Sequence, residues 1–395
     1  MDSELKNFAK VWFSVFISLC YCYAMGKLVP RGIPRLLVVL PIVCLFLVLP
    51  LNISSVHLGG TTAFFVAWLA NFKLLLFAFD KGPLSSDPPI SLGRFVAVAC
   101  LPIKVQQNPP PKLPEKPQNI QNKENPAPKS HSNGQTRENP DEKFLSNGHS
   151  KANPVYGKPK KGQKSPLNYA IKGLLLALLV RVYDYSEHIH PTVILILYCI
   201  HIYFGLEIIL AIVAALARAL LGLDLEPQFD DPYLSTSLQD FWGRRWNLVV
   251  TSILRPTVYE PVLHIAARVT GSRRWALMPA VLGTFVVSAI MHELIFYYLG
   301  REKPTWEVTG FFLLHGVCLM VEIALKKAFS GRFRLPRLIS GPLTLGFVMV
   351  TGFWLFFPQL LRCNMDVRAL EEYAAIGAFF KKAFRVVSSN SFNTS

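Results

Sequence analysis

Long apolar runs alternate with short polar connections along most of this chain. A membrane core about 30 Å thick needs about 20 apolar helical residues to cross it. Backbone groups in lipid must pair within their own structure, and the chain lacks the alternating pattern of barrel strands, which leaves helices. We predict an all-α, polytopic membrane protein with about eight crossings and a range of about seven to ten. The predicted spans are Lys10–Leu28, Arg35–Leu51, Thr61–Phe79, Leu167–Tyr183, Thr192–Leu221, Trp275–Leu299, Trp306–Leu325 and Leu338–Leu361.

Two shorter apolar stretches need separate interpretation. Val11–Ala24 resembles the core of a secretory signal, but Asp2 and Glu4 precede it where a signal carries positive charge. We therefore expect it to stay attached as the first anchor. Phe95–Ile103 is too short to span a membrane, and we expect a re-entrant or interfacial segment there.

Residues 104–166 differ in composition from the rest of the chain. They are rich in Pro, Asn, Lys and Ser, and twelve Lys or Arg against five Asp or Glu give a net charge of +7. Such a segment buries too little apolar surface to offset the entropy of ordering, so we predict a disordered cytosolic linker. The predicted organisation is N-terminal transmembrane helices in 1–103, the linker in 104–166, a second transmembrane core in 167–365, and a C-terminal amphipathic segment and tail in 366–395.

The charge distribution fits a membrane protein better than a nucleic-acid-binding protein. The chain has 395 residues, of which 51% are hydrophobic and 17% charged, and its net charge is +16. The basic residues gather in the connections, as cytoplasmic loops require. The linker also lacks the interleaved aromatic residues of a nucleic-acid-binding segment, so no nucleic-acid partner is expected. The clusters that define the predicted cytoplasmic side are Lys27, Arg31 and Arg35; Arg268, Arg273 and Arg274; and Lys326, Lys327, Arg332, Arg334 and Arg337.

His292 stands inside the apolar run Trp275–Leu299. An ionisable group at the membrane centre costs about 2.5 to 3.5 kcal/mol on insertion scales, so such residues usually line a cavity or a pathway. Ser288 lies one turn earlier on the same helical face, whereas Glu293 points roughly 100° away. A neutral imidazole in a dry cavity can accept a hydroxyl proton. The alternative is a structural histidine packed between helices.

Other ionisable residues carry weaker signals. His315 and Glu322 are seven residues apart in the next span, so they share a helical face. With His292 they could equally form the proton or substrate path of a transporter, although the internal repeats common in transporters are absent from the sequence. Seven cysteines show no zinc-type spacing, and we expect neither structural disulfides nor a metal.

A second polar constellation occupies residues 240–247, with the sequence DFWGRRWN, before an apolar stretch broken by prolines. Arg244 and Arg245 could bind phosphates through paired hydrogen bonds. Trp246 suits the membrane interface, and Asn247 could donate or accept a hydrogen bond deeper in the membrane. An interfacial anchor of aromatic and arginine residues explains the same pattern equally well.

The sequence resembles the plant wax synthases, which are long-chain-alcohol O-fatty-acyltransferases of the membrane-bound O-acyltransferase superfamily. The resemblance covers nearly the whole chain outside residues 104–166. It is carried by Trp68–Asp80 (WLANFKLLLFAFD), Gly82–Leu84, Leu221–Asp224, Pro227–Phe229, Pro232–Leu234, Ser237–Leu248 (SLQDFWGRRWNL), Met291–Glu293 and Thr305–Glu322.

The resemblance implies roles for two of these residues. His292 corresponds to the superfamily's catalytic histidine, and Asn247 corresponds to its second signature polar residue. Glu293 stands where some relatives carry Asp, so no catalytic role follows for it. The implied fold is helical around an intramembrane tunnel, and the implied acyltransferase core is 167–365. Acyl-CoA is expected to enter from the cytosol and the lipid alcohol from the membrane.

The function implied is transfer of a fatty acyl group from acyl-CoA to a long-chain alcohol, giving a wax ester and CoA. His292 and Asn247 are the expected catalytic residues; the expected substrate-binding residues are Arg244, Arg245, Trp246, Ser288 and His315. Acyl-CoA is a co-substrate, and neither cofactor nor metal is expected. A multi-pass position in the endoplasmic reticulum membrane is expected, with membrane lipids as surroundings. Acylation of a sterol or of diacylglycerol is the alternative within the superfamily, and the sequence leaves the oligomeric state open.

Overall fold

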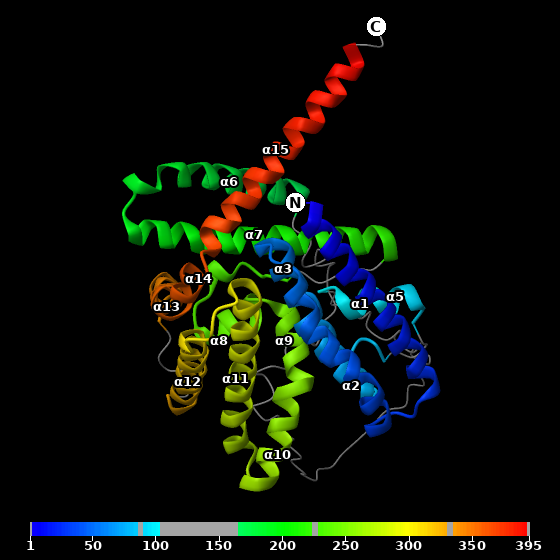
Figure 1. Ribbon diagram of the computed structural model, residues 1–395. Helices are drawn as coiled ribbons and strands as arrows, with labels where there is room; N and C mark the ends of the chain where they lie inside the picture. Colours follow the sequence, from blue (N-terminus) through cyan, green and yellow to red (C-terminus); the bar gives the residue numbers. More distant parts are fainter. Residues whose placement is uncertain (1, 86–89, 103–164, 223–227, 330–334, 393–395) are drawn as a thin grey trace, which may run out of the picture. The chain divides into compact units, whose positions relative to one another are not determined.

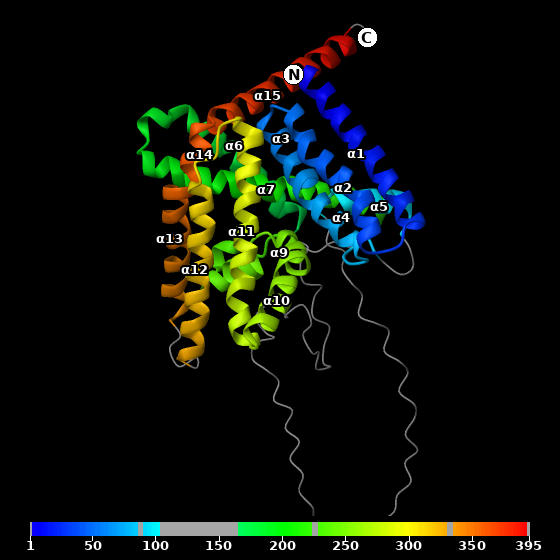
Figure 2. The same ribbon diagram turned by 60° about the horizontal axis from the view of Figure 1, so that its bottom comes forward.

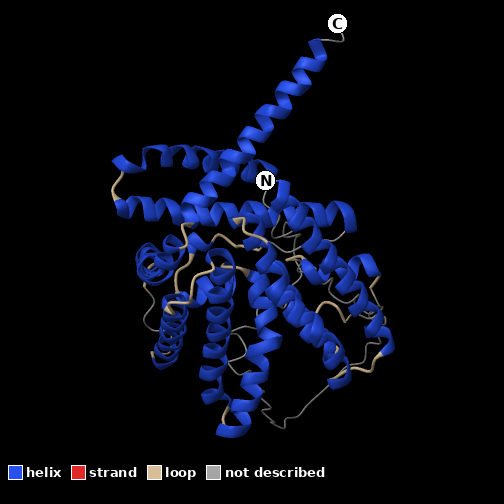
Figure 3. Ribbon diagram, in the orientation of Figure 1, coloured by secondary structure: helices blue, strands red, loops and turns tan. Residues whose placement is uncertain are grey.

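The computed structural model describes residues 2–85, 90–102, 165–222, 228–329 and 335–392, and no strand occurs within them (Figure 3). The all-α prediction is therefore confirmed. The α-helices are α1 (Asp2–Leu28), α2 (Ile33–Val48), α3 (Val56–Thr62), α4 (Asn71–Ala78), α5 (Leu92–Cys100), α6 (Pro166–Val182), α7 (Pro191–Leu221), α8 (Leu238–Asp240), α9 (Leu248–Leu254), α10 (Glu260–Thr270), α11 (Arg273–Gly300), α12 (Glu307–Ala328), α13 (Arg337–Thr351), α14 (Phe357–Arg362) and α15 (Met365–Phe392).

Tighter or wider turns join several of these helices. The 3₁₀ turns are η1 (Leu49–Asn52), η4 (Tyr183–His188) and η5 (Pro232–Leu234). The π-helical turns, which add a residue to the helical repeat and often occur at functional sites, are η2 (Ala63–Ala70), η6 (Phe241–Arg245), η7 (Arg255–Tyr259) and η8 (Gly352–Phe356).

Eight helical stretches among the described residues are long and apolar enough to cross a membrane. Each contains most of one predicted span, so the prediction of about eight crossings is confirmed at the level of length and hydropathy. The first stretch begins at Ser3 and not at Lys10, because the helix continues through its polar first turns. The stretches are Ser3–Leu28, Ile33–Asn52, Val56–Ala78, Pro166–His188, Pro191–Leu220, Arg273–Gly300, Glu307–Ala328 and Arg337–Arg362.

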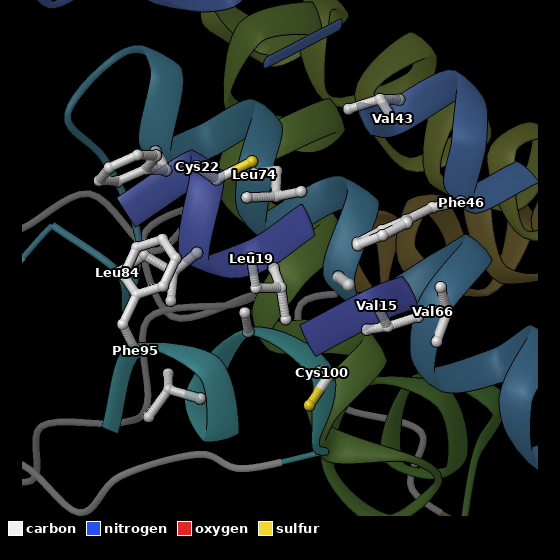
Figure 4. Packing of buried hydrophobic residues seen from close by; sticks show 14 of the residues in the cluster. Val15, Leu19, Cys22, Val43, Phe46, Val66, Leu74, Leu84, Phe95 and Cys100 are labelled. Atoms are coloured by element: carbon white, nitrogen blue, oxygen red, sulfur yellow. The ribbon is translucent and has the colours of Figure 1, made fainter. Parts of the chain in front are cut away.

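The N-terminal helices form one hydrophobic core. Leu19, Phe46, Leu74 and Phe95 come from α1, α2, α4 and α5, and their side chains lie between these helices (Figure 4). α5 is the short helix expected near Phe95, and it is not among the candidate spans. The side chain of buried Lys73 holds the C-terminal end of α5, because its Nζ donates to the carbonyl oxygens of Val98 at 2.6 Å and Leu101 at 2.7 Å.

The C-terminal half contains two groups of helices. α11 packs against both α10 and α12, whereas α6 packs along α7. Figures 1 and 2 show α6 and α7 as an antiparallel pair that crosses α11 and α12 and does not run beside them. A buried ion pair joins α6 to α7, with Lys172 Nζ 2.6 Å from Glu207 Oε2. Length and hydropathy alone did not indicate this difference in direction.

The C-terminal helix is tied to the start of α3. Glu372 of α15 accepts hydrogen bonds from the backbone N–H of Val56 and His57, and its Oε2 lies 2.6 Å from His57 Nδ1. These contacts hold the first half of α15, which was predicted as an amphipathic segment. The predicted linker lies outside the described residues up to position 164, and the predicted division into four segments stays a prediction.

Candidate active site

His292 lies in the middle of α11 with its tautomer set by the backbone. Its Nδ1 is 2.7 Å from the carbonyl oxygen of Ser288, one turn earlier. A carbonyl oxygen only accepts, so Nδ1 carries the hydrogen and a neutral ring keeps a lone pair on Nε2. No described residue hydrogen-bonds to that Nε2, and the side chain remains partly accessible. This nitrogen is therefore free to accept a proton from a ligand.

Aromatic rings from three other segments surround the imidazole. Phe312 of α12 lies 4.4 Å away between ring centroids, Trp68 of η2 lies 5.2 Å away in an edge-to-face arrangement, and Phe356 of η8 lies 5.9 Å away. Rings at these distances exclude bulk water from much of the space beside His292. The result is a proton acceptor in an apolar enclosure, as the activation of an alcohol requires.

Small residues allow η2 to approach α11 closely. Ala63 and Ala67, one turn apart, are buried against Tyr298. On the other side of η2, Phe65 and Leu69 pack against α9. η2 thus lies between the helix that carries His292 and the helix that follows Asn247.

Asn247 has an unusual backbone conformation. Its φ is 42°, in the left-handed region that non-glycine residues seldom adopt, although Asn tolerates it better than most. Its Oδ1 caps α9 by accepting from Val250 N at 3.4 Å. The Nδ2 group has no acceptor within the described part of the chain. The side chain therefore combines a structural cap with a donor that remains available.

Phe312 connects the 240–247 segment with His292 through contacts between aromatic rings. The ring of Trp242, in the 240–247 segment, lies 6.0 Å from that of Phe312, which in turn lies 4.4 Å from His292. Residues about 50 positions apart in the sequence therefore contribute to one aromatic environment. The sequence did not predict this bridge, because nothing in the spacing of Phe312 distinguishes it from an ordinary core residue.

His315 is fully buried, at 0% exposure, and both of its ring nitrogens are engaged. Trp242 Nε1 donates to Nδ1 at 3.1 Å, so Nε2 carries the hydrogen and donates to Thr351 Oγ1 at 2.8 Å. Thr351 Oγ1 in turn donates to the carbonyl oxygen of Phe347 at 2.7 Å. This chain of hydrogen bonds leaves His315 no ring nitrogen for a substrate. Its predicted substrate contact stays a prediction, and the geometry favours a positioning role.

Glu322 lies on the same face of α12 as His315, and it contacts the chain just before the 240–247 segment. Its carboxylate accepts from the backbone N–H of Leu238 at 2.8 Å and of Gln239 at 3.3 Å. The predicted common face of His315 and Glu322 therefore exists, and it holds the chain that leads to Asn247.

The two arginines of the segment have different surroundings. Arg245 donates from Nε to Asp240 Oδ2 at 2.8 Å and from Nη1 to the carbonyl oxygens of Asp230 and Asp231. Arg244 is exposed, and no hydrogen bond or ion pair joins it to a described residue. Trp246 stacks on Phe241 at 5.4 Å. Of the two arginines, Arg244 is the one whose guanidinium is left available among the described residues.

Glu293, next to the histidine, serves the structure of the helix pair. It is 5% exposed, and Oε1 accepts from Thr309 N at 3.0 Å and Thr309 Oγ1 at 2.9 Å, in the first turn of α12. Ser288 contributes its carbonyl to His292, and its hydroxyl is joined to no described side chain. No group of three or more His, Cys, Asp or Glu placed to hold a metal occurs among the residues described.

Comparisons with known proteins place the chain in a family. The model of the "Membrane bound O-acyl transferase family" matches residues 225–314, which include both Asn247 and His292. The chain is 50% identical to acyl-CoA–sterol O-acyltransferase 1 of Arabidopsis thaliana, over 95% of this chain and 96% of that protein. It is 44% identical to a long-chain-alcohol O-fatty-acyltransferase of Simmondsia chinensis, over 97% of each, and 43% identical to a probable long-chain-alcohol O-fatty-acyltransferase 3 of Arabidopsis thaliana, over 97% and 98%. Similarity of this extent shows that the chain belongs to the membrane-bound O-acyltransferase family.

Proposed function

We propose that this protein transfers a fatty acyl group from acyl-CoA to a long-chain alcohol, forming a wax ester and CoA in the endoplasmic reticulum membrane. The observation that carries the proposal is the lone pair on His292 Nε2, left without a partner in the described structure and enclosed by Trp68, Phe312 and Phe356. Relatives named as long-chain-alcohol O-fatty-acyltransferases, at 41–44% identity, support the choice of acceptor.

The proposed chemistry is direct transfer without a covalent enzyme intermediate. His292 Nε2 takes the hydroxyl proton while the alcohol oxygen forms a bond with the thioester carbonyl carbon. The carbon–sulfur bond then breaks, and the departing sulfur of CoA takes the proton from the imidazolium. Every proton and electron pair is accounted for by the two substrates and one histidine, so the reaction needs no metal or cofactor.

Asn247 and Arg244 supply the polar contacts of the acyl donor in this proposal. The free Nδ2 of Asn247 donates to the carbonyl oxygen as negative charge develops on it. The exposed guanidinium of Arg244 binds a phosphate of CoA. Arg245 keeps its contacts with Asp240 and the preceding backbone, and so shapes the segment without touching the substrate.

A sterol acceptor is the second candidate, because the relative at 50% identity is named an acyl-CoA–sterol O-acyltransferase. Both acceptors present one hydroxyl on a large apolar body, so His292 would activate either in the same way. The difference lies in the shape of the space beyond the hydroxyl. No corresponding observation favours diacylglycerol.

The test is expression in yeast that cannot make neutral lipids, with fatty alcohols and sterols supplied separately. Total lipids are analysed for wax esters and steryl esters, with the His292→Ala variant as the inactive control. The proposal predicts wax esters that depend on His292. Steryl esters without wax esters would assign the second candidate, and no ester from any acceptor would reject both. Fractionation of the same cells tests the location in the endoplasmic reticulum.

A further inference from the structure

Trp68 has a buried hydrogen-bond donor that the described structure leaves unused. The side chain is 2% exposed, and its indole Nε1 has no partner among the described residues. Its ring lies edge to face with the imidazole of His292, 5.2 Å between centroids. The unused donor therefore belongs to a ring that contacts the proposed catalytic base.

An unpaired N–H in a protein interior is destabilising, because the group loses its hydrogen bond to water and gains nothing in return. The same region pairs another indole without difficulty, since Trp12 Nε1 donates to Thr62 Oγ1 at 3.2 Å. Trp68 lies in the π-helical segment η2, a geometry associated with functional sites. The unsatisfied donor at Trp68 therefore belongs to a π-helical segment whose indole ring contacts His292.

We propose that Trp68 is a further catalytic residue, whose Nε1–H donates to the carbonyl oxygen of the acyl group. The inference rests on the proposed acyl transfer and adds a residue that neither the sequence motifs nor the roles above assign. An indole N–H only donates, so its substrate partner must be an oxygen with a lone pair. The proposed reaction brings two such oxygens close to His292, namely the hydroxyl oxygen of the alcohol and the carbonyl oxygen of the acyl-CoA thioester.

The chemistry selects the carbonyl oxygen. When the alcohol oxygen bonds to the carbonyl carbon, the π electron pair of the carbonyl moves onto its oxygen, where a donor stabilises the new charge. When that pair returns, the carbon–sulfur bond breaks and CoA leaves. A donor to the alcohol oxygen would instead withdraw electron density from the nucleophile. Trp68 and Asn247 would then be two donors to one oxyanion, one supplied by η2 and the other by the residue that caps α9.

The test compares variants that remove the N–H with and without a change in ring size. Trp68→Phe shortens the side chain, whereas benzothienylalanine at position 68, introduced by codon reassignment, replaces N–H with sulfur and keeps the bicyclic shape. Turnover is measured per detergent-stable molecule at saturating acyl-CoA and alcohol. Both variants should lose about 100-fold in turnover with little change in KM, which is the usual effect of losing one oxyanion donor. Trp12→Phe, which removes a paired indole, should lower protein yield and keep turnover.

A binding measurement supplies a readout that packing would not affect. Wild-type protein should bind an acyl-CoA analogue with a ketone in place of the thioester more tightly than a thioether analogue without the carbonyl, and both Trp68 variants should lose part of that preference. Wild-type turnover in the benzothienyl variant, or an unchanged preference for the ketone, would overturn the inference. Failure of the proposed function is distinguishable, because the wild-type protein would then form no ester with any acceptor.

Discussion

Trp242 donates its indole hydrogen to Nδ1 of His315 across 3.1 Å, which joins the segment before Asn247 to the middle of α12. The bond fixes the histidine as the tautomer that donates from Nε2 to Thr351. We therefore expect His315 to be a positioning residue whose effect on catalysis passes through Trp242.

This pairing predicts coupling between the two side chains. Trp242→Phe and His315→Leu should each lower turnover and detergent stability, and the double variant should lose less than the sum of the two. A coupling free energy of about 1 kcal/mol is expected for one buried hydrogen bond. Thermal unfolding of the four proteins of the cycle measures it in detergent. Strict additivity would show that the bond contributes nothing.

His292→Ala should abolish ester synthesis and leave the amount of membrane-inserted protein nearly unchanged. A methyl group cannot accept the alcohol proton, and it places no new polar group in the aromatic enclosure. Microsomes with equal amounts of each protein are assayed, with exposed His264→Ala on α10 as the matched control. Near wild-type synthesis by the His292 variant would return this residue to a structural role.

The helix-capping role of Asn247 Oδ1 and the proposed donor role of its Nδ2 can be tested separately. Asn247→Asp keeps an oxygen for Val250 N and tolerates the positive φ, but it loses the Nδ2 donor. The variant should fold and lose about 100 to 1000-fold in turnover even with saturating alcohol, because the lost contact acts mainly in the transition state. Turnover is measured per folded molecule with acyl-CoA and alcohol varied independently. Full turnover with reduced yield would leave Asn247 as a helix cap only.

Arg244 and Arg245 should respond differently to the same substitution. Arg244→Ala should raise the KM for acyl-CoA several-fold, and the difference from wild type should shrink as salt screens the phosphate contact. Arg245→Ala should instead reduce the yield of folded protein, because Asp240 and the carbonyls of Asp230 and Asp231 lose their donor. An identical kinetic effect of the two substitutions would remove this division of roles.

The sequence by itself determined which segments form membrane-length helices, and it supplied the main candidate residue of the site. Lipid cannot hydrogen-bond an exposed backbone, so runs of about 20 apolar residues had to become helices, and their positions could be predicted along the chain. The same reasoning made His292 a candidate, because an ionisable group inside such a run is costly, and the family resemblance implied its catalytic role. The common face of His315 and Glu322 followed from helical periodicity alone.

Only the tertiary structure decided which polar groups are left available. Arg244 and Arg245 are adjacent and chemically identical, and the contacts of Arg245 with residues 230 and 231 distinguish them. The enclosure of His292 by Trp68 and Phe312 joins segments more than 200 positions apart. Sequence patterns report the period of one helix, whereas the satisfaction of a donor depends on which other helix lies beside it. For that reason the unused indole of Trp68 could be found only after the helices had been placed.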